Sequence, residues 1–280
     1  MRGWKRFIES IKDFFFSIPR IVVINSYKLV VRIRVFNRQR LPEGKPFILA
    51  INHVTGADPL IILGGIKKKI TFLAGSGNFT NVVSNFFMRR CANAVPVFKE
   101  KTIKNVNTFK EIFDISKDTK TVFGIFPEGS LNKKDGFKKF HKGVAYLSYK
   151  MKMPILPVYI SDIRKGFGKN RLLGRFVVLE GISAIFLNFF NKVNVFIGNP
   201  IDPIAENIIK DFKDLKDKTS IKEMTEDIND ALSDEFLSLK QEADEYSSRH
   251  LKPRSANMDV DLELDDRMID DLDDLGITDN

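Results

Sequence analysis

The pattern of hydrophobic and polar positions divides the chain into short apolar runs and longer segments of helical periodicity. Short continuous apolar runs bounded by polar or turn residues are typical of buried strands. Such runs predict strands at 47–51, 70–74, 94–99, 121–126 and 155–160. Residues 32–36 alternate between basic and apolar side chains, which predicts an edge strand.

Helical patterns lie between these predicted strands. They predict a helix from Pro59, then helices over 82–90, 103–116 and 143–150, and a charged helical region over 204–248. Alternating strands and helices favour an α/β fold, in which a mixed, mostly parallel central sheet is flanked by helices. Reactive loops of such a fold gather at the carboxyl ends of the strands.

The two ends of the chain differ from this central pattern, which leaves 32–253 as the predicted α/β domain. Residues 1–31 mix Trp and Phe with Lys and Arg, and Pro19 divides them. They lack the ~20 consecutive apolar residues of a membrane span, so we predict amphipathic helices at a membrane interface. A helical hairpin packed on the protein's own core is the alternative. Residues 254–280 are acidic and predict a disordered tail.

Charge and composition narrow the possible partners. The whole chain carries +9, but residues 255–280 contribute −9, so residues 1–254 carry +18. A body this basic favours polyanions: nucleic acid, anionic lipid or a phosphorylated substrate. The single cysteine excludes an internal disulfide framework and suits a reducing compartment. Three histidines and one cysteine do not predict a metal site.

The candidate chemistry begins where the predicted strand 47–51 ends. His53 and Asp58 follow, five residues apart, around a small and flexible centre. A neutral imidazole can take a proton near pH 7, and a carboxylate on its other ring nitrogen fixes the tautomer. No Ser-His-Asp order is present, so the activated hydroxyl would belong to a substrate. Alternatively, Asp58 before Pro59 could be only a helix N-cap.

Further polar groups follow other predicted strands. Glu128, Gly129 and Ser130 come after the strand 121–126, and Lys99 ends the strand 94–99. A basic cluster with interleaved aromatic residues comes next, comprising Lys133, Lys134, Lys138, Lys139, His141 and Lys142. Cys91 is an alternative candidate nucleophile.

Four blocks in this order resemble those of the glycerolipid acyltransferase family, of the lysophosphatidic acid acyltransferase type. They are Asn52-His53 with Asp58, Val95-Pro96-Val97-Phe98-Lys99, Phe126-Pro127-Glu128-Gly129-Ser130 and Pro154-Ile155-Leu156-Pro157-Val158. The resemblance extends over about residues 30 to 200. Each block alone is a weak signal, whereas four in order are a strong one.

The resemblance implies transfer of a fatty acyl group from a thioester to the hydroxyl of lysophosphatidate, which makes phosphatidate in phospholipid biosynthesis. His53 would be the general base, oriented by Asp58. Lys99, Glu128, Gly129, Ser130, Lys138 and Lys142 would bind the acceptor's phosphate and glycerol. Glu128 could accept from a glycerol hydroxyl or brace its own loop.

The implied partners are a lysophospholipid, an anionic membrane at its cytoplasmic face, and acyl-coenzyme A or acyl carrier protein as donor. No cofactor, metal or nucleic acid is implied, and the protein would be peripheral or monotopic. Alternatives are an acyltransferase for another lysophospholipid and a non-catalytic basic module that binds membrane or nucleic acid.

The blocks also depart from the family pattern at two positions. Lys99 stands where the second block usually has arginine, and Leu131 stands where the third block usually continues with arginine. Lysine keeps the positive charge of arginine but loses its bidentate contact with a phosphate, and leucine loses both the charge and the contact.

Overall fold

The computed structural model describes residues 21–22, 24–29, 31–80, 82–98, 103–118, 120–132, 136–161, 192–203 and 218–250. Several predictions concern residues outside these ranges, namely most of the N-terminal segment, Lys99, Lys133, Lys134 and the acidic tail. The boundaries of the predicted domains stay predictions.

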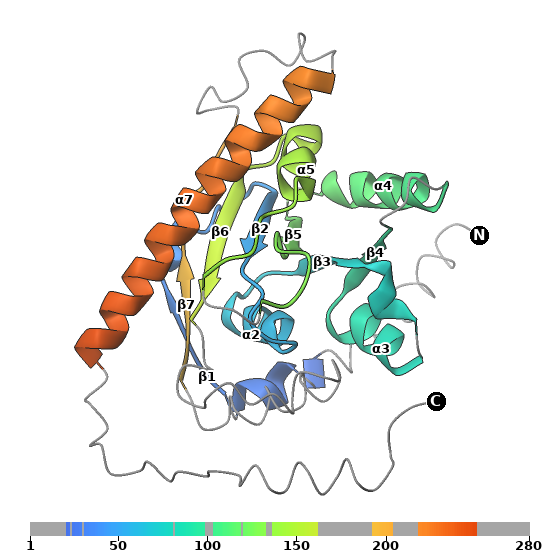
Figure 1. Cartoon of the computed structure of the whole chain (residues 1–280). Helices are drawn as coiled ribbons and strands as arrows, with labels where there is room; N and C mark the ends of the chain where they lie inside the picture. The colour runs from blue at the N-terminus through green and yellow to red at the C-terminus, as the bar shows by residue number, and fades with distance from the viewer. Residues whose placement is uncertain are drawn as a thin grey trace, which may run out of the picture. The chain divides into compact units, whose positions relative to one another are not determined.

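The described residues form a seven-stranded sheet in the order β1-β7-β6-β2-β5-β3-β4 (Figure 1). The strands are β1 (Arg32–Phe36), β2 (Phe47–Ile51), β3 (Ile70–Gly75), β4 (Ala94–Val97), β5 (Val122–Ile125), β6 (Ile155–Ile160) and β7 (Lys192–Ile197). All neighbouring pairs are parallel except β6 and β7, which are antiparallel. The predicted mixed, mostly parallel sheet is therefore confirmed.

The position of each strand agrees with its hydrophobic pattern. All five residues of β2 are buried, as its continuous apolar run predicts for a central strand covered on both faces. The alternating β1 lies at one edge of the sheet. At the other edge, β4 contains Pro96, which an edge strand tolerates because one side of its ladder is unpaired.

Helices connect the strands, as βαβ units require. They are α2 (Asp58–Gly65), α3 (Val82–Phe86), α4 (Ile103–Ser116) and α5 (Gly143–Met151). A further helix, α7 (Lys218–His250), follows the last strand, and 3₁₀ turns lie at η1 (Arg38–Arg40) and η2 (Ser76–Phe79). Residues 24–29 are also helical. None of the described helices is long and apolar enough to cross a bilayer.

One predicted helix differs in type from the expectation. The helix predicted over 82–90 is α-helical only to Phe86 and continues as a π-helical turn, η3 (Phe87–Cys91). The Ala92 N–H donates to the carbonyl of Phe87, five residues earlier, at 3.0 Å. Single π-helical turns are frequent at functional sites, and hydrophobic periodicity over so short a segment could not distinguish the two forms.

The close packing of α2 on β1 depends on two glycines. A Cβ on Gly64 would lie 2.8 Å from Cδ1 of Ile33, and one on Gly65 would lie 3.0 Å from Cγ2 of Val35. The absence of side chains there lets the helix approach the strand.

The chain divides into two compact units, Met1–Ala243 and Asp244–Asn280. The sheet and α2 to α5 belong to the first unit, and so does most of α7. That part of α7 buries apolar side chains at helical spacing, namely Met224, Ile228, Leu232, Phe236, Leu239 and Ala243. The last turns of α7 belong to the second unit.

Candidate active site

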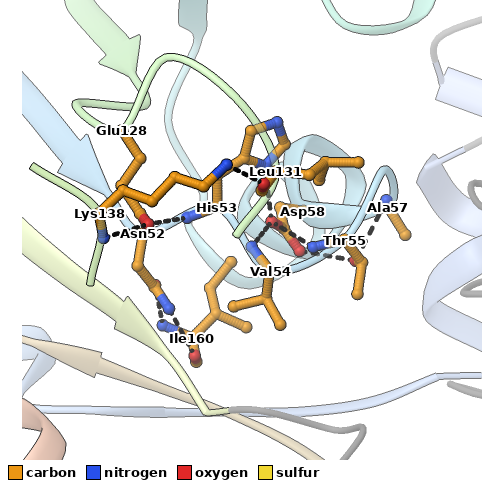
Figure 2. A network of polar contacts seen from close by, with 10 residues as sticks. All are labelled: Asn52, His53, Val54, Thr55, Ala57, Asp58, Glu128, Leu131, Lys138 and Ile160. Carbon is orange, nitrogen blue, oxygen red and sulfur yellow. Dashed lines mark hydrogen bonds and ion pairs between the residues drawn. The ribbon is translucent and has the colours of Figure 1, made fainter. Parts of the chain in front are cut away.

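The candidate site begins where Asn52 ends the pairing of β2 with β6. The side-chain amide of Asn52 donates to the carbonyl of Ile160 at 2.9 Å, and its side-chain oxygen accepts from the Ile160 N–H at 2.7 Å (Figure 2). A side chain thus takes over the pairing that the backbone of β2 would otherwise continue. The main chain is free to turn away from the sheet at His53.

Asp58 holds the ring of His53 and the turn before α2. Its Oδ2 atom lies 2.9 Å from Nδ1 of His53 and accepts from the N–H groups of Val54 at 2.7 Å and Thr55 at 2.9 Å (Figure 2). Its Oδ1 atom accepts from the hydroxyl of Thr55 at 2.7 Å. The side chain of Asp58 is fully buried. The Asp58 carboxylate, buried at the start of a helix, thus has four hydrogen-bonding partners.

The N-cap interpretation of Asp58 is wrong. The N-cap of α2 is Ala57, Asp58 is the first helical residue, and the Asp58 carboxylate accepts from N–H groups that precede the helix. The carboxylate therefore organises the loop and the imidazole.

The contact with Asp58 fixes the orientation of the His53 ring. With Asp58 accepting from Nδ1–H, the neutral ring has its lone pair on Nε2. Among the described residues, none forms a hydrogen bond with Nε2. The ring stacks on Phe126, with centroids 4.1 Å apart, and its side chain is 19% exposed. The ring is thus held on one side and accessible from the other.

The backbone of His53 is fixed by the loop that follows β5. Its N–H donates to Oε1 of Glu128 at 2.9 Å, and its carbonyl accepts from the N–H of Asn132 at 2.7 Å. The other oxygen of Glu128 accepts from the N–H of Lys138 at 3.1 Å. Glu128 is only 2% exposed. Of the two roles considered for Glu128, the geometry favours bracing, because a buried carboxylate with both oxygens engaged is poorly placed for a glycerol hydroxyl.

Gly129 occupies a position that other residues would strain. Its φ of +65° is left-handed, and an added Cβ would lie 2.7 Å from Cδ2 of His141. Gly44 has the same φ but open space around it. The two glycines therefore separate the cost of the backbone conformation from the cost of the contact.

We expect Gly129→Ala to lower the free energy of unfolding by about 1–3 kcal/mol, and by more than Gly44→Ala does. In a His141→Ala background the excess should disappear, because the ring that meets the new methyl group is gone. Chemical denaturation of the four variants measures both effects. Equal losses for Gly129→Ala and Gly44→Ala would contradict the close contact with His141.

The predicted phosphate-binding residues are only partly brought together. The ammonium of Lys138 donates to the hydroxyl of Ser130 at 3.0 Å and to the carbonyl of Leu131 at 2.5 Å. Lys142 instead forms an ion pair with Glu226 of α7 at 2.7 Å. That hydrogen bond lowers the pKa of the Glu226 carboxyl, but both side chains are exposed and such a pair contributes little. Lys99 lies outside the described residues.

Other candidate chemistries gain no support from the described residues. Cys91 is buried, and its burial raises the pKa of the thiol, which disfavours the reactive thiolate. Within the described ranges, no three histidine, cysteine or acidic side chains gather as metal ligands would.

Four supporting residues were not predicted. The Thr55 spacing to Asp58 is that of a capping box, so the sequence did carry a signal for it. Asn52 stood in the first block but was given no role. Phe126 stood in the third block but was likewise given no role, and Asn132 gave no signal. The contacts of both residues with His53 join segments far apart in sequence.

Parts of the chain are similar to known proteins. Residues 32–161 match the family model described as acyltransferase. The Caenorhabditis elegans protein acl-1, named as a candidate 1-acyl-sn-glycerol-3-phosphate acyltransferase, is 25% identical over 155 residues, covering 52% of this chain and 56% of that protein. A 1-acyl-sn-glycerol-3-phosphate acyltransferase of Borreliella burgdorferi is 26% identical over 165 residues, covering 56% and 62%. The match thus spans less than two thirds of either relative.

A solved structure is also similar. The crystal structure of the 1-acyl-sn-glycerophosphate acyltransferase PlsC from Thermotoga maritima aligns with a TM-score of 0.47 and 19% identity, covering 83% of each chain. The match to the family model includes the turn bearing His53 and Asp58. Residues 32–161, somewhat less than half of the chain, are therefore similar to the acyltransferase family.

Proposed function

We propose that this protein is an O-acyltransferase that moves a fatty acyl group from an acyl thioester to the free hydroxyl of lysophosphatidate, making phosphatidate in phospholipid biosynthesis. The observation that carries this proposal is the His53–Asp58 pair, in which a buried carboxylate contacts an accessible imidazole. The pair lies within the residues that match the acyltransferase family model. The names of the two curated relatives support the choice of acceptor.

In the proposed reaction, Nε2 of His53 removes the proton from the acceptor hydroxyl as that oxygen attacks the thioester carbonyl carbon. Asp58 stabilises the imidazolium that forms and keeps Nδ1 protonated. Collapse of the tetrahedral intermediate breaks the carbon–sulfur bond, and the departing thiolate takes the proton from Nε2. The ester product and free thiol leave His53 neutral for the next cycle.

The proposal is tested by initial rates of acyl transfer to lysophosphatidate, with acyl-coenzyme A and acyl carrier protein thioesters assayed separately as donors. Transfer from at least one donor is expected. A folded protein that binds anionic vesicles but transfers from neither donor would favour the non-catalytic basic module. The same assay on other lysophospholipids tests the acceptor class.

The acceptor's phosphate would be held by Lys99 and Lys138. Lys138 is a suitable candidate because its ammonium lies against Ser130 and the carbonyl of Leu131. Lys138 could therefore supply the positive charge for the phosphate that Leu131, which stands in place of an arginine, does not provide. An ammonium is a point charge and distinguishes phosphate geometry less sharply than a guanidinium does.

We therefore expect the wild type to accept lysophosphatidate with only modest selectivity over a lysophospholipid whose phosphate is substituted. Leu131→Arg should increase that selectivity, whereas Lys99→Ala and Lys138→Ala should raise the KM for lysophosphatidate, by about tenfold where a charge-assisted contact is lost. Initial rates for both acceptors measure these effects.

The control for this acceptor test is Lys139→Ala, because Lys139 is an exposed lysine of the same segment. Its KM should stay near that of the wild type. A wild type already highly selective, and unaffected by Lys99→Ala and Lys138→Ala, would mean that the phosphate is bound elsewhere.

A further inference from the structure

Helix α3 exposes two large apolar side chains. Val82 is 86% exposed and Phe86 is 53% exposed. They are four residues apart and so lie on the same side of the helix. Exposing a large side chain forgoes the stabilisation that burial would give it. Two such residues on one short helix suggest an apolar partner.

The sequence around α3 carries only positive charge. From residue 59 to residue 99 the sequence contains no aspartate or glutamate, but it contains six lysines and arginines. Arg89 lies one turn beyond Phe86, where its Nε donates to Oδ1 of Asn85 at 3.0 Å and its guanidinium lies 5.4 Å from the ring centre of Phe79. Arginine beside exposed apolar residues is the composition of segments that bind the interface of anionic membranes.

The sheet topology places α3 at the same end of the strands as the candidate active site. α3 follows the carboxyl end of β3 through η2, and His53 follows the carboxyl end of β2. β3 and β2 both pair in parallel with β5, so the carboxyl ends of β2 and β3 lie on the same side of the sheet, at the carboxyl end of its parallel strands. In Figure 1 the arrows of β2 and β6 point toward the end of the sheet where α2 and α3 lie.

A second group of exposed apolar residues precedes β1. Ile21, Val22 and Leu29 are 50%, 55% and 88% exposed. β1 is parallel to β7, which is antiparallel to β6. The amino end of β1 therefore lies beside the carboxyl end of β6. The exposed apolar residues of α3 and those that precede β1 therefore belong to the same end of the sheet as His53.

We infer that α3 is a membrane-contact helix, which inserts Val82 and Phe86 into the interface of an anionic bilayer while Arg89 pairs with lipid phosphates. A bilayer fits better than a protein partner, because α3 is short, its surroundings in the sequence lack acidic residues, and its cations match lipid phosphates. Contact at this end of the sheet would hold the candidate active site against the membrane surface, which contains the proposed lipid acceptor. The inference itself does not depend on the proposed reaction, since vesicle binding is measured without turnover.

The test uses a single tryptophan as a reporter of depth. Trp4 is the only tryptophan, so Trp4→Phe provides a dark background into which Phe86→Trp is introduced. The matched control is Phe113→Trp on α4, because Phe113 is 52% exposed and also has a cation beside it, Lys117 at 5.0 Å from its ring centre. The vesicles contain phosphatidylcholine and phosphatidylglycerol, with or without bromine on the acyl chains.

We expect brominated acyl chains to quench the fluorescence of the Phe86→Trp variant at least severalfold more than that of the Phe113→Trp variant. Phe86→Asp should weaken sedimentation with these vesicles about tenfold, since one large apolar contact is lost, and Phe113→Asp less than twofold. Circular dichroism checks that each variant is folded.

Equal quenching of the two tryptophan variants would overturn the inference. So would a Phe86→Trp variant whose indole is already shielded from aqueous acrylamide without vesicles, because another part of the protein would then cover α3.

Discussion

Replacing His53 with alanine should lower kcat for acyl transfer by ~10² or more, the contribution expected of a general base. The fold should survive, because the ring is partly exposed and the turn is held by bonds that the ring does not make. The backbone N–H and carbonyl of His53 would still pair with Glu128 and Asn132.

His250→Ala is the control for this prediction. His250 is exposed at the end of α7 and accounts for one of the three histidines of the chain. We expect its kcat to equal that of the wild type. A folded His53→Ala protein with near-normal turnover would falsify the assignment of the base.

Asp58→Asn should reduce both activity and stability. An amide offers one acceptor oxygen in place of two, and its NH₂ group would face donors that Asp58 now accepts from. Leaving buried donors unsatisfied costs about 1–3 kcal/mol. The imidazole would also lose the carboxylate that fixes its tautomer, so kcat should fall by ~10² or more. Thermal unfolding and initial rates measure the two effects separately.

Thr55→Val separates the contribution of Asp58 to the stability of the turn from its effect on the His53 imidazole. It removes the hydroxyl that donates to Asp58 and accepts from the N–H of Ala57, but it leaves the contact with Nδ1 of His53 intact. We expect a loss of about 1–2 kcal/mol in stability, with kcat within a fewfold of the wild type. If Asp58→Asn changes only stability, as Thr55→Val should do, the carboxylate has a purely structural role.

Most strands were predictable because each combines a distinct pattern with clear boundaries, whereas the strand predicted over 94–99 ends at Val97. The apolar run 47–51 is β2 at its full length, and the alternating segment 32–36 is β1 at the sheet edge. Burial on both faces or on one face produces these patterns directly. The π-helical turn after Phe86 was not predictable in the same way, because five residues contain too little of either helical period.

The His53–Asp58 contact was predictable because both residues lie in one short turn. The contacts of Glu128 and Asn132 with the His53 backbone were not, since they depend on β5 lying beside β2 in the sheet. For the same reason, the sequence grouped Lys138 with Lys142, although their ammonium groups have different partners. Proximity along a basic segment does not determine where each long side chain points.

The most direct test of the account is a double-mutant cycle on kcat with saturating lysophosphatidate and the better of the two donors. If Asp58 acts by orienting and stabilising His53, the two residues form one unit and their effects are not additive. The account predicts that Asp58→Asn added to His53→Ala lowers kcat no further than His53→Ala alone. A double variant whose loss equals the product of the two single losses would contradict it, because the two residues would then act independently.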